Sequence, residues 1–267
     1  MKVKIVISGC LGRMGERIAC LAFNASDIEV IAGIEKEDHP SIGEDLSEVL
    51  GKGRRGIEIT SDFKQAISKS DVLIEFTSPK VTLKHIQVAS GLGKKILIGT
   101  TGFDEQGIQE IKKTGSETAV LISPNMSIGV NVMFKIMPQL VKLLGEDYDI
   151  EIVELHHNKK KDAPSGTAKK IAEIICDARS NLKCTYGRQG LTGPRDKDEL
   201  AIHALRLGDI TGEHRIIFAG NDERIEFIHS AGSRDIFAEG VILGVRYIRD
   251  KKSGFYTMGD VLSQRLR

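Results

Sequence analysis

Residues 3–15 read VKIVISGCLGRMG, and this stretch decides the fold of the first part of the chain. The run Val3–Ser8 is apolar and rich in β-branched residues, as expected of a strand buried on both faces. Glycines then stand at every third position, and apolar residues recur at helical spacing from Arg13 to Ala25. The order strand, glycine turn, helix predicts a dinucleotide-binding β-α-β unit. The turn lets the backbone approach a pyrophosphate, and the helix N-terminus offers it free N–H groups. A plain strand-to-helix turn is the alternative.

An acidic residue about 20 positions beyond the glycine turn supports the nucleotide interpretation. Glu35 ends the second predicted strand, Ile28–Ile34, where a carboxylate accepts hydrogen bonds from the adenosine ribose hydroxyls. Lys36 follows directly, and its ammonium suits the 2′-phosphate of NADPH, although a solvated surface lysine is the alternative. We therefore expect NADH, NADPH or both as the cofactor.

Strands and helices continue to alternate up to residue 122, which predicts a parallel sheet with right-handed crossovers. Loops at the carboxyl ends of such strands line the ligand crevice, so Gly99–Gly102 and Phe76–Pro79 are candidate cofactor loops, with ordinary turn chemistry as the alternative. The further predicted strands are Val72–Phe76, Ile96–Ile98 and Ala119–Ile122, and the predicted helices lie near Phe63–Ser68, Leu83–Ser90 and Asp104–Lys113.

The pattern changes near Asn125 and predicts a second domain. Alternating apolar and polar residues, as in DIEIVEL at Asp149–Leu155, indicate strands of a mixed or antiparallel sheet with one solvated face. We expect an α/β protein with a Rossmann-type parallel-sheet domain (1–126 and 237–267) and an α+β substrate and oligomerisation domain with an open mixed sheet (127–236). The predicted elements of the second half are helices Val130–Leu144 and Gly166–Ala178, strands Leu200–Leu207, His214–Ala219 and Arg224–Ala231, a loop at Lys251–Gly254, and a partly helical Ile236–Leu266 that returns to the first domain.

Composition narrows the class of partner. The formal net charge of the 267 residues is +1, which gives no field attracting nucleic acid or an anionic membrane. No apolar run reaches membrane-spanning length, and no signal segment leads the sequence. The four cysteines show neither C-x-x-C nor zinc-ligand spacing, with Cys176 expected in a helix and Cys184 in a loop. We expect a soluble cytoplasmic protein without a disulfide framework or a metal site.

The densest chemical signal is HHNKKKDAPSGT at residues 156–167. It follows a strand and opens a helix, with Ser165 as the expected N-cap, so the N–H groups of Gly166 and Thr167 can bind a carboxylate. Two histidines and three lysines supply proton donors and cations. A solvated lysine face and structural histidines are the alternatives, but all these groups occur within 12 residues. Zinc is disfavoured because adjacent histidines do not converge on one metal.

These motifs together resemble the dihydrodipicolinate reductase family, also called 4-hydroxy-tetrahydrodipicolinate reductases, of lysine and diaminopimelate synthesis. The resemblance runs nearly end to end. It rests on G-C-L-G-R-M-G (9–15), I-G-T-T-G-F (98–103), N-M-S-I-G-V-N (125–131), E-L-H-H-N-K-K-K-D-A-P-S-G-T (154–167) and G-D-I-T-G-E-H (208–214).

The resemblance implies a role for each matching residue. His156 matches the family's catalytic acid/base and Lys160 its proton-donating lysine. The substrate carboxylates match His157, Ser165, Gly166 and Thr167. The cofactor contacts match Gly9, Cys10, Leu11, Gly12, Arg13, Met14, Glu35, Lys36, Gly99, Thr100, Thr101, Ser123, Pro124, Asn125 and Met126.

The resemblance also implies a homotetramer that is joined through the open sheet of the second domain. The last helix of each chain is then expected to pack on the nucleotide domain. The chain departs from the family at Lys36, where arginine is frequent; lysine keeps the charge but loses the planar fork, so NADPH preference is open. A basic residue at Lys161 fills a variable position without clear consequence.

The implied reaction reduces a cyclic imine dicarboxylate that carries a hydroxyl at C4. Water is lost, hydride arrives at C4, and His156 or Lys160 supplies the proton to the ring. Two rival interpretations are open. One is another two-domain dehydrogenase acting on an amine or an alcohol. The other is a dinucleotide-sensing regulator without turnover, against which the lack of a basic DNA-binding element counts.

Overall fold

The computed structural model describes residues 1–264, and the chain forms two compact units. Unit 1 comprises residues 1–128 together with the described residues from 234 onward, and unit 2 comprises residues 129–233. Each unit has its own sheet and its own hydrophobic core. No helix within residues 1–264 is long and apolar enough to cross a membrane.

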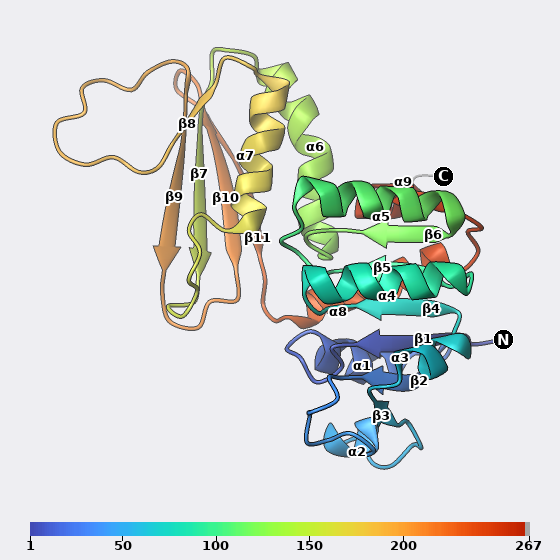
Figure 1. The fold of residues 1–267 in the computed structure, drawn as a ribbon. Helices are drawn as coiled ribbons and strands as arrows, with labels where there is room; N and C mark the ends of the chain where they lie inside the picture. Colours follow the sequence, from blue (N-terminus) through green and yellow to red (C-terminus); the bar gives the residue numbers. More distant parts are fainter. Residues whose placement is uncertain (265–267) are drawn as a thin grey trace. The chain divides into compact units, whose positions relative to one another are not determined.

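Unit 1 is built on a parallel sheet whose described strands run in the order β12-β6-β5-β4-β1-β2-β3 (Figure 1). The order reverses at β1, which pairs with β2 on one side and β4 on the other. This is the switch point at which open α/β sheets hold their ligands. The strands are β1 (Val3–Ser8), β2 (Ile28–Ile34), β3 (Ile59–Thr60), β4 (Val72–Glu75), β5 (Lys95–Ile98), β6 (Ala119–Ile122) and β12 (Gly254–Tyr256).

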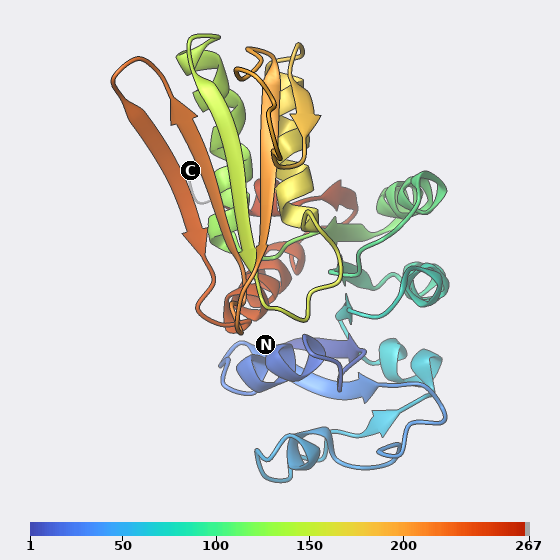
Figure 2. The same ribbon diagram turned by 90° about the vertical axis from the view of Figure 1, so that its left-hand side faces the viewer.

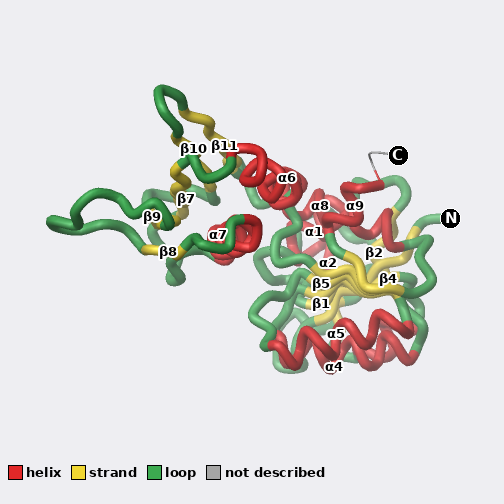
Figure 3. The backbone as a smooth tube through the Cα atoms, turned by 90° about the horizontal axis from the view of Figure 1, so that it is seen from above, coloured by secondary structure: helices red, strands yellow, loops and turns green. Residues whose placement is uncertain are grey.

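Helices cover both faces of this sheet. Figure 3 shows α4 and α5 on one face and α1, α8 and α9 on the other. Helix α8 returns from unit 2 and packs against α1, β5 and β6, as expected for the last stretch of the chain. The helices are α1 (Gly15–Ala22), α2 (Leu46–Val49), α3 (Phe63–Ser68), α4 (Pro79–Gly91), α5 (Glu105–Glu117), α8 (Asp235–Ile248) and α9 (Met258–Gln264).

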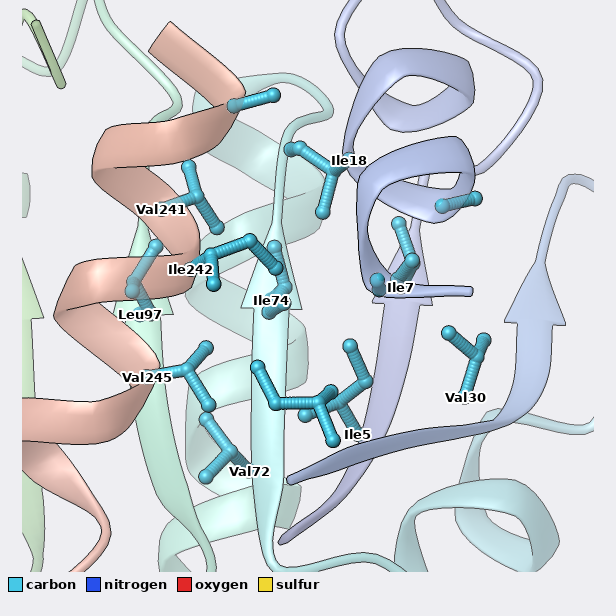
Figure 4. Close-up of a cluster of buried hydrophobic side chains, with 14 of the residues drawn as sticks. Ile5, Ile7, Ile18, Val30, Val72, Ile74, Leu97, Val241, Ile242 and Val245 are labelled. Carbon is cyan, nitrogen blue, oxygen red and sulfur yellow. The ribbon is translucent and has the colours of Figure 1, made fainter. Parts of the chain in front are cut away.

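Burial on both faces explains the continuous apolar run of β1. Ile5 and Ile7 point into the cluster under α1 and α8, which Figure 4 shows in close-up. Val6 points to the opposite face and joins the cluster under α4 and α5. All three are fully buried, and each such side chain contributes on the order of 2 kcal/mol of hydrophobic stabilisation.

Unit 2 is a mixed sheet in the order β11-β10-β7-β9-β8 (Figure 2). Strand β7 pairs antiparallel with β10 and parallel with β9, so the expected mixed sheet is confirmed. Helices α6 and α7 lie on one face of it (Figure 3). The elements are α6 (Ile128–Leu144), β7 (Asp149–His156), α7 (Gly166–Ala178), β8 (Lys183–Thr185), β9 (Glu199–Arg206), β10 (Glu213–Ala219) and β11 (Arg224–Ser230).

The alternation of β7 decides which side chains face these helices. Ile150 and Ile152 are buried in the core with residues of α6 and α7. Glu154 and His156 continue the same face, because side chains two apart on a strand point the same way. A carboxylate and an imidazole therefore stand at the inner edge of an apolar core.

Several predicted bounds were wrong. The strand predicted at Val72–Phe76 ends at Glu75, whereas the second strand has its predicted bounds, Ile28–Ile34, with Glu35 directly after it. Helix α1 begins at Gly15, since the preceding residues form turns. Cys184 lies in edge strand β8, not in a loop, and Gly254 opens β12. The very short elements α2, β3, β8 and β12 were not predicted, because these segments are too short to show a hydrophobic periodicity.

Candidate functional site

The glycine turn after β1 is shaped by close backbone approach. Gly9 has a φ of +75°, and a Cβ there would lie 2.5 Å from the Phe76 carbonyl oxygen. A Cβ on Gly15 would lie 2.1 Å from the Gly9 carbonyl oxygen. Only glycine fits either position, since real Cβ contacts never become so short. The motif thus lets β1, β4 and the start of α1 meet at one point.

A cavity of about 750 Å³ opens beside this turn. Glu35 lies on its wall, and one of its carboxylate oxygens already accepts a hydrogen bond from Leu11 N at 2.9 Å. Lys36 is exposed and pairs with Asp38 at 3.3 Å. The predicted residues on the wall are Gly9, Leu11, Gly12, Glu35, Lys36, Phe76 and Thr77, and the others are Ser8, Ile34, Glu37, His39, Ser61, Asp62, Val81 and His85.

The remaining predicted cofactor residues do not line this cavity. The Cys10 side chain is buried in the core, and burial together with nearby Glu35 raises the pKa of its thiol to about 12. Gly99–Thr101 follows β5 and Ser123–Met126 follows β6, at the same carboxyl edge of the sheet as the glycine turn. Arg13 is exposed and Met14 is partly buried at the start of α1.

A polar network behind that edge was missed by sequence analysis. Glu75 is fully buried and accepts hydrogen bonds from Thr77 Oγ1 at 2.8 Å and from Thr82 Oγ1 at 3.2 Å. Thr82 Oγ1 also lies 2.9 Å from Thr100 Oγ1, and Thr77 N donates to Thr100 Oγ1 at 3.1 Å. The loops that follow β4 and β5 are therefore linked to each other through this network.

In unit 2, His156 is held by a buried carboxylate. His156 Nδ1 donates to Glu154 Oε2 at 2.5 Å, and Glu154 has no exposed surface. Nε2 points past Gly212, where a Cβ would come within 3.0 Å of it. The carboxylate fixes the orientation of the ring. This is the arrangement of an oriented general acid or base.

Three groups keep Glu154 ionised. Arg206 donates to both oxygens, at 2.8 and 2.9 Å, and Ser165 N donates to Oε1 at 3.0 Å. Burial by itself would raise the pKa of Glu154. The hydrogen bonds from His156, Arg206 and Ser165 N outweigh that effect and lower the pKa to about 2.

Arg206 also connects this carboxylate to the lysine-rich loop. One guanidinium nitrogen donates to the Asp162 carbonyl oxygen at 2.6 Å. The side chain of Asp162 accepts from Lys160 Nζ at 2.8 Å, and the Lys160 ammonium holds the pKa of that carboxyl below its ordinary value. The structure thus joins His156 and Lys160 into one network through Glu154, Arg206 and Asp162.

The start of α7 closes the site. Ser165 is the predicted N-cap, confirmed by a hydrogen bond from Ala168 N to Ser165 Oγ at 3.2 Å. Ser165 is buried, and its Oγ lies 3.0 Å from His214 Nε2. Burial and the nearby His156 lower the pKa of His214 to about 3, so its ring is neutral. Gly166 is exposed, while His157 and Thr167 are partly buried on either side of the loop.

Some residues missed in unit 2 left a signal in the sequence. Alternation in DIEIVELH places Glu154 on the core-facing side, two residues before His156, and a carboxylate there needs partners. His214 ends the quoted motif G-D-I-T-G-E-H. Arg206 left none, since its position opposite His156 follows from the register of β7 with β9.

A nucleotide-type crevice at a sheet switch point and an imidazole held by a buried carboxylate define an oxidoreductase built from a Rossmann-type domain and a second domain. The family comparisons match both parts. The model described as "Dihydrodipicolinate reductase, N-terminus" matches residues 3–126, and "Dihydrodipicolinate reductase, C-terminus" matches residues 129–262. The chain belongs to the dihydrodipicolinate reductase family.

Individual relatives match over almost their whole length. The 4-hydroxy-tetrahydrodipicolinate reductase of Methanocaldococcus jannaschii is 46% identical over 267 residues, covering 97% of each chain. That of Syntrophus aciditrophicus is 43% identical and covers 98% of this chain and 99% of its own. The dipicolinate-bound dihydrodipicolinate reductase from Paenisporosarcina sp. TG-14 is 25% identical, with a TM-score of 0.76, covering 97% of this chain and 99% of that one.

Proposed function

We propose that this chain reduces 4-hydroxy-tetrahydrodipicolinate to tetrahydrodipicolinate with NADH or NADPH, in diaminopimelate and lysine biosynthesis. The observation that carries the proposal is the network around Glu154, which unites an oriented imidazole, an ammonium group and a helix start. The family membership of both units and the names of the full-length relatives support this reaction.

Unit 1 is proposed to hold the dinucleotide. The proposed dinucleotide-binding domain that is built on it has its limits at residues 1–126 and 237–267. Its crevice offers backbone amides at the glycine turn and a carboxylate at Glu35. Because Glu35 is held by Leu11 N, it is oriented before a ribose arrives. The nicotinamide ring supplies the hydride when bound, and the protein positions it. The predicted contacts at Gly99–Thr101 and Ser123–Met126 belong to this proposal.

Unit 2 is proposed to hold the substrate. The proposed substrate domain that is built on it has its limits at residues 127–236. A dicarboxylate needs cations and N–H donors; His157, Lys160 and the amides of Gly166 and Thr167 are of that kind. Ser165 contributes as the helix cap, since both its backbone N–H and its hydroxyl are already engaged. Dipicolinate, the ligand named for the Paenisporosarcina protein, is a stable analogue of such a substrate.

His156 is proposed to deliver the proton after hydride reaches ring C4. Its Nδ1 is bound to Glu154, which leaves Nε2 as the transferring atom. The Glu154 carboxylate orients the imidazole for the transfer, and the two hydrogen bonds from Arg206 help to keep that carboxylate ionised. Lys160 stabilises developing negative charge or donates the proton.

The proposal also includes assembly into a homotetramer through the solvated face of the unit 2 sheet. Light scattering then gives a mass near four times the 29.3 kDa of one chain. A monomer at micromolar concentration would contradict this part without touching the chemistry.

The direct test of the reaction follows NADH and NADPH absorbance with enzymatically generated substrate. We expect turnover with this ring and competitive inhibition by dipicolinate. Binding of NADH without any turnover would support the sensing rival instead. Turnover of amino acids or alcohols without turnover of the ring would support the other dehydrogenase rival.

A further inference from the structure

His85 is a titratable residue of the unit 1 crevice that no motif assigned. It lies on α4, and its ring stacks on Phe63 with centroids 3.8 Å apart and planes 6° from parallel. Its Nδ1 donates to Glu75 Oε1 at 2.6 Å and lies 3.3 Å from Ser8 Oγ. One ring nitrogen and one ring face are therefore committed inside the protein.

The His85 ring is also part of the cavity wall. The His85 side chain is 18% exposed and lines the crevice. Among residues 1–264, Nε2 has no hydrogen-bond partner, and it is not a buried unsatisfied atom. Since Nδ1 and the Phe63-facing side are occupied, the accessible part of the imidazole is its Nε2 edge.

Glu75 explains why the ring is held so firmly. It is fully buried, and its Oε1 accepts the hydrogen bond from His85 Nδ1. A buried carboxylate that loses a hydrogen-bond donor is left with an unsatisfied oxygen, so separating the two is costly. Nε2 is thus fixed in direction before any ligand enters, which lowers the entropy cost of binding.

We propose that His85 binds the adenosine half of the dinucleotide through Nε2, and that Glu75 is the positioning residue for it. This rests on the proposed function of unit 1. The adenosine half is favoured because His85 shares the cavity with Glu35 and with the apolar side chains of Ile34, Phe76 and Val81. Apolar walls suit a purine base, whereas backbone amides at the glycine turn suit the phosphates.

The test uses His85→Asn, which keeps a donor near Nδ1 and removes Nε2. Dissociation constants are measured calorimetrically for NADH, ADP-ribose, nicotinamide mononucleotide and inorganic pyrophosphate. We expect NADH and ADP-ribose to bind about tenfold more weakly, as for loss of one hydrogen bond, and the other two to be unchanged. Unchanged ADP-ribose binding overturns the proposal. Equal weakening of every ligand, or weakening confined to pyrophosphate, also overturns it.

Glu75→Gln tests the positioning role. We expect it to weaken ADP-ribose binding, and the double variant with His85→Asn to be no weaker than the weaker single variant, because both act through Nε2. Additive losses would show that Glu75 acts only on the fold. His203→Asn is the matched control, since His203 also contacts a glutamate, Glu151 at 2.8 Å, but lies in unit 2. If the unmodified chain bound neither NADH nor ADP-ribose, the proposed function itself would fail.

A second, independent observation concerns two cysteines of unit 2. Cys176 Sγ, near the end of α7, lies 3.8 Å from Cys184 Sγ in β8. Both are free thiols; Cys184 is exposed and Cys176 is partly buried. The sulfurs are within a small side-chain rotation of bonding distance, which is about 2 Å for a disulfide.

We infer that this pair is a modification site that closes to a disulfide when a disulfide oxidant such as oxidised glutathione is present. The exposed Cys184 thiolate attacks the oxidant and releases one reduced glutathione. The Cys176 thiolate then displaces the second, so the protein loses two protons and two electrons, and the oxidant gains them. Burial and the neighbouring Cys184 raise the pKa of Cys176 to about 12, which favours Cys184 as the attacking thiol.

The test is intact mass after treatment with oxidised glutathione. We expect the mass to fall by two hydrogens and the reactive thiols of Cys176 and Cys184 to disappear together. Cys176→Ser and Cys184→Ser should each prevent the mass loss, whereas Cys20→Ser, a matched control on α1, should retain it. Stable glutathione adducts on the unmodified chain, or no change, would overturn the inference.

Discussion

The two units build their sites in different ways. In unit 1 the crevice is made by backbone at strand ends, with close approach at Gly9 and Gly15. In unit 2 the site is made by side chains gathered around one buried carboxylate, Glu154, which accepts from a ring, a guanidinium and a backbone amide. The first depends on topology and the second on an ion network.

This difference predicts different sensitivities. A backbone site tolerates most side-chain changes that leave the turn intact, because the amides remain in place. A side-chain network fails as a unit, because removing one partner leaves the others buried and uncompensated. Substitutions in unit 2 should therefore affect turnover and stability, and those in unit 1 should affect cofactor affinity.

The largest effect is expected for His156→Gln. Loss of the oriented acid should lower kcat by about 10²–10⁴. Steady-state kinetics measure kcat, which depends on unit 2. Fluorescence titration measures the NADH dissociation constant, which depends on unit 1 and should be unchanged. Near-normal kcat would remove His156 from the proton-transfer role.

Lys160→Ala comes next, with kcat lower by about 10²–10³ if the ammonium stabilises transition-state charge. Lys161→Ala is the matched control, because the neighbouring lysine is exposed. Equal losses in the two variants would mean that the loop acts through its total charge rather than through Lys160.

Acid should destabilise unit 2 through two groups. The pKa of His214 is lowered from 6.5 to about 3, so protons favour the unfolded state as pH falls below 6.5. The pKa of Glu154 is lowered from 4.5 to about 2, so its stabilisation is present above 4.5 and is lost as pH falls through 2.

Each group contributes a slope of at most about 1.4 kcal/mol per pH unit in its own range. Denaturant unfolding at a series of pH values measures it. In His214→Gln the free energy of unfolding should depend less on pH between 6.5 and 3. In Glu154→Gln it should depend less on pH between 4.5 and 2. Because Glu154→Gln also breaks a buried pair, it should lower the free energy of unfolding by about 3–5 kcal/mol at neutral pH. Unchanged slopes in both variants would contradict the burial of these groups.

The smallest effect is expected in unit 1. Glu35→Ala should weaken NADH binding about tenfold, through loss of a charged hydrogen bond to the ribose, and NADPH binding less. Glu37→Ala is the matched control on the same cavity wall. If NADH and NADPH lost affinity equally, Glu35 would support the turn through Leu11 rather than contact the ribose.

Much of the fold was predictable because long elements carry their own periodicity. The run Val3–Ser8 and the helix Gly166–Ala178 were predicted with the bounds that the structure gives. The Ser165 cap was predictable because its chemistry is local. The short elements α2, β3, β8 and β12 were not, and neither was the Glu75 network, whose members come from β4, α4 and the loops after β4 and β5.

The sequence by itself determined the two sheets, the glycine turn, the capped helix of unit 2 and the family, because each depends on neighbours in the chain or on a motif of fixed spacing. Only the tertiary structure decided which groups hold the functional side chains. Arg206 reaches Glu154 through strand register, and His85 reaches Glu75 from a helix ten residues on. A buried charge requires a hydrogen-bonding or charged partner. No local pattern in the sequence identifies which residue will be that partner.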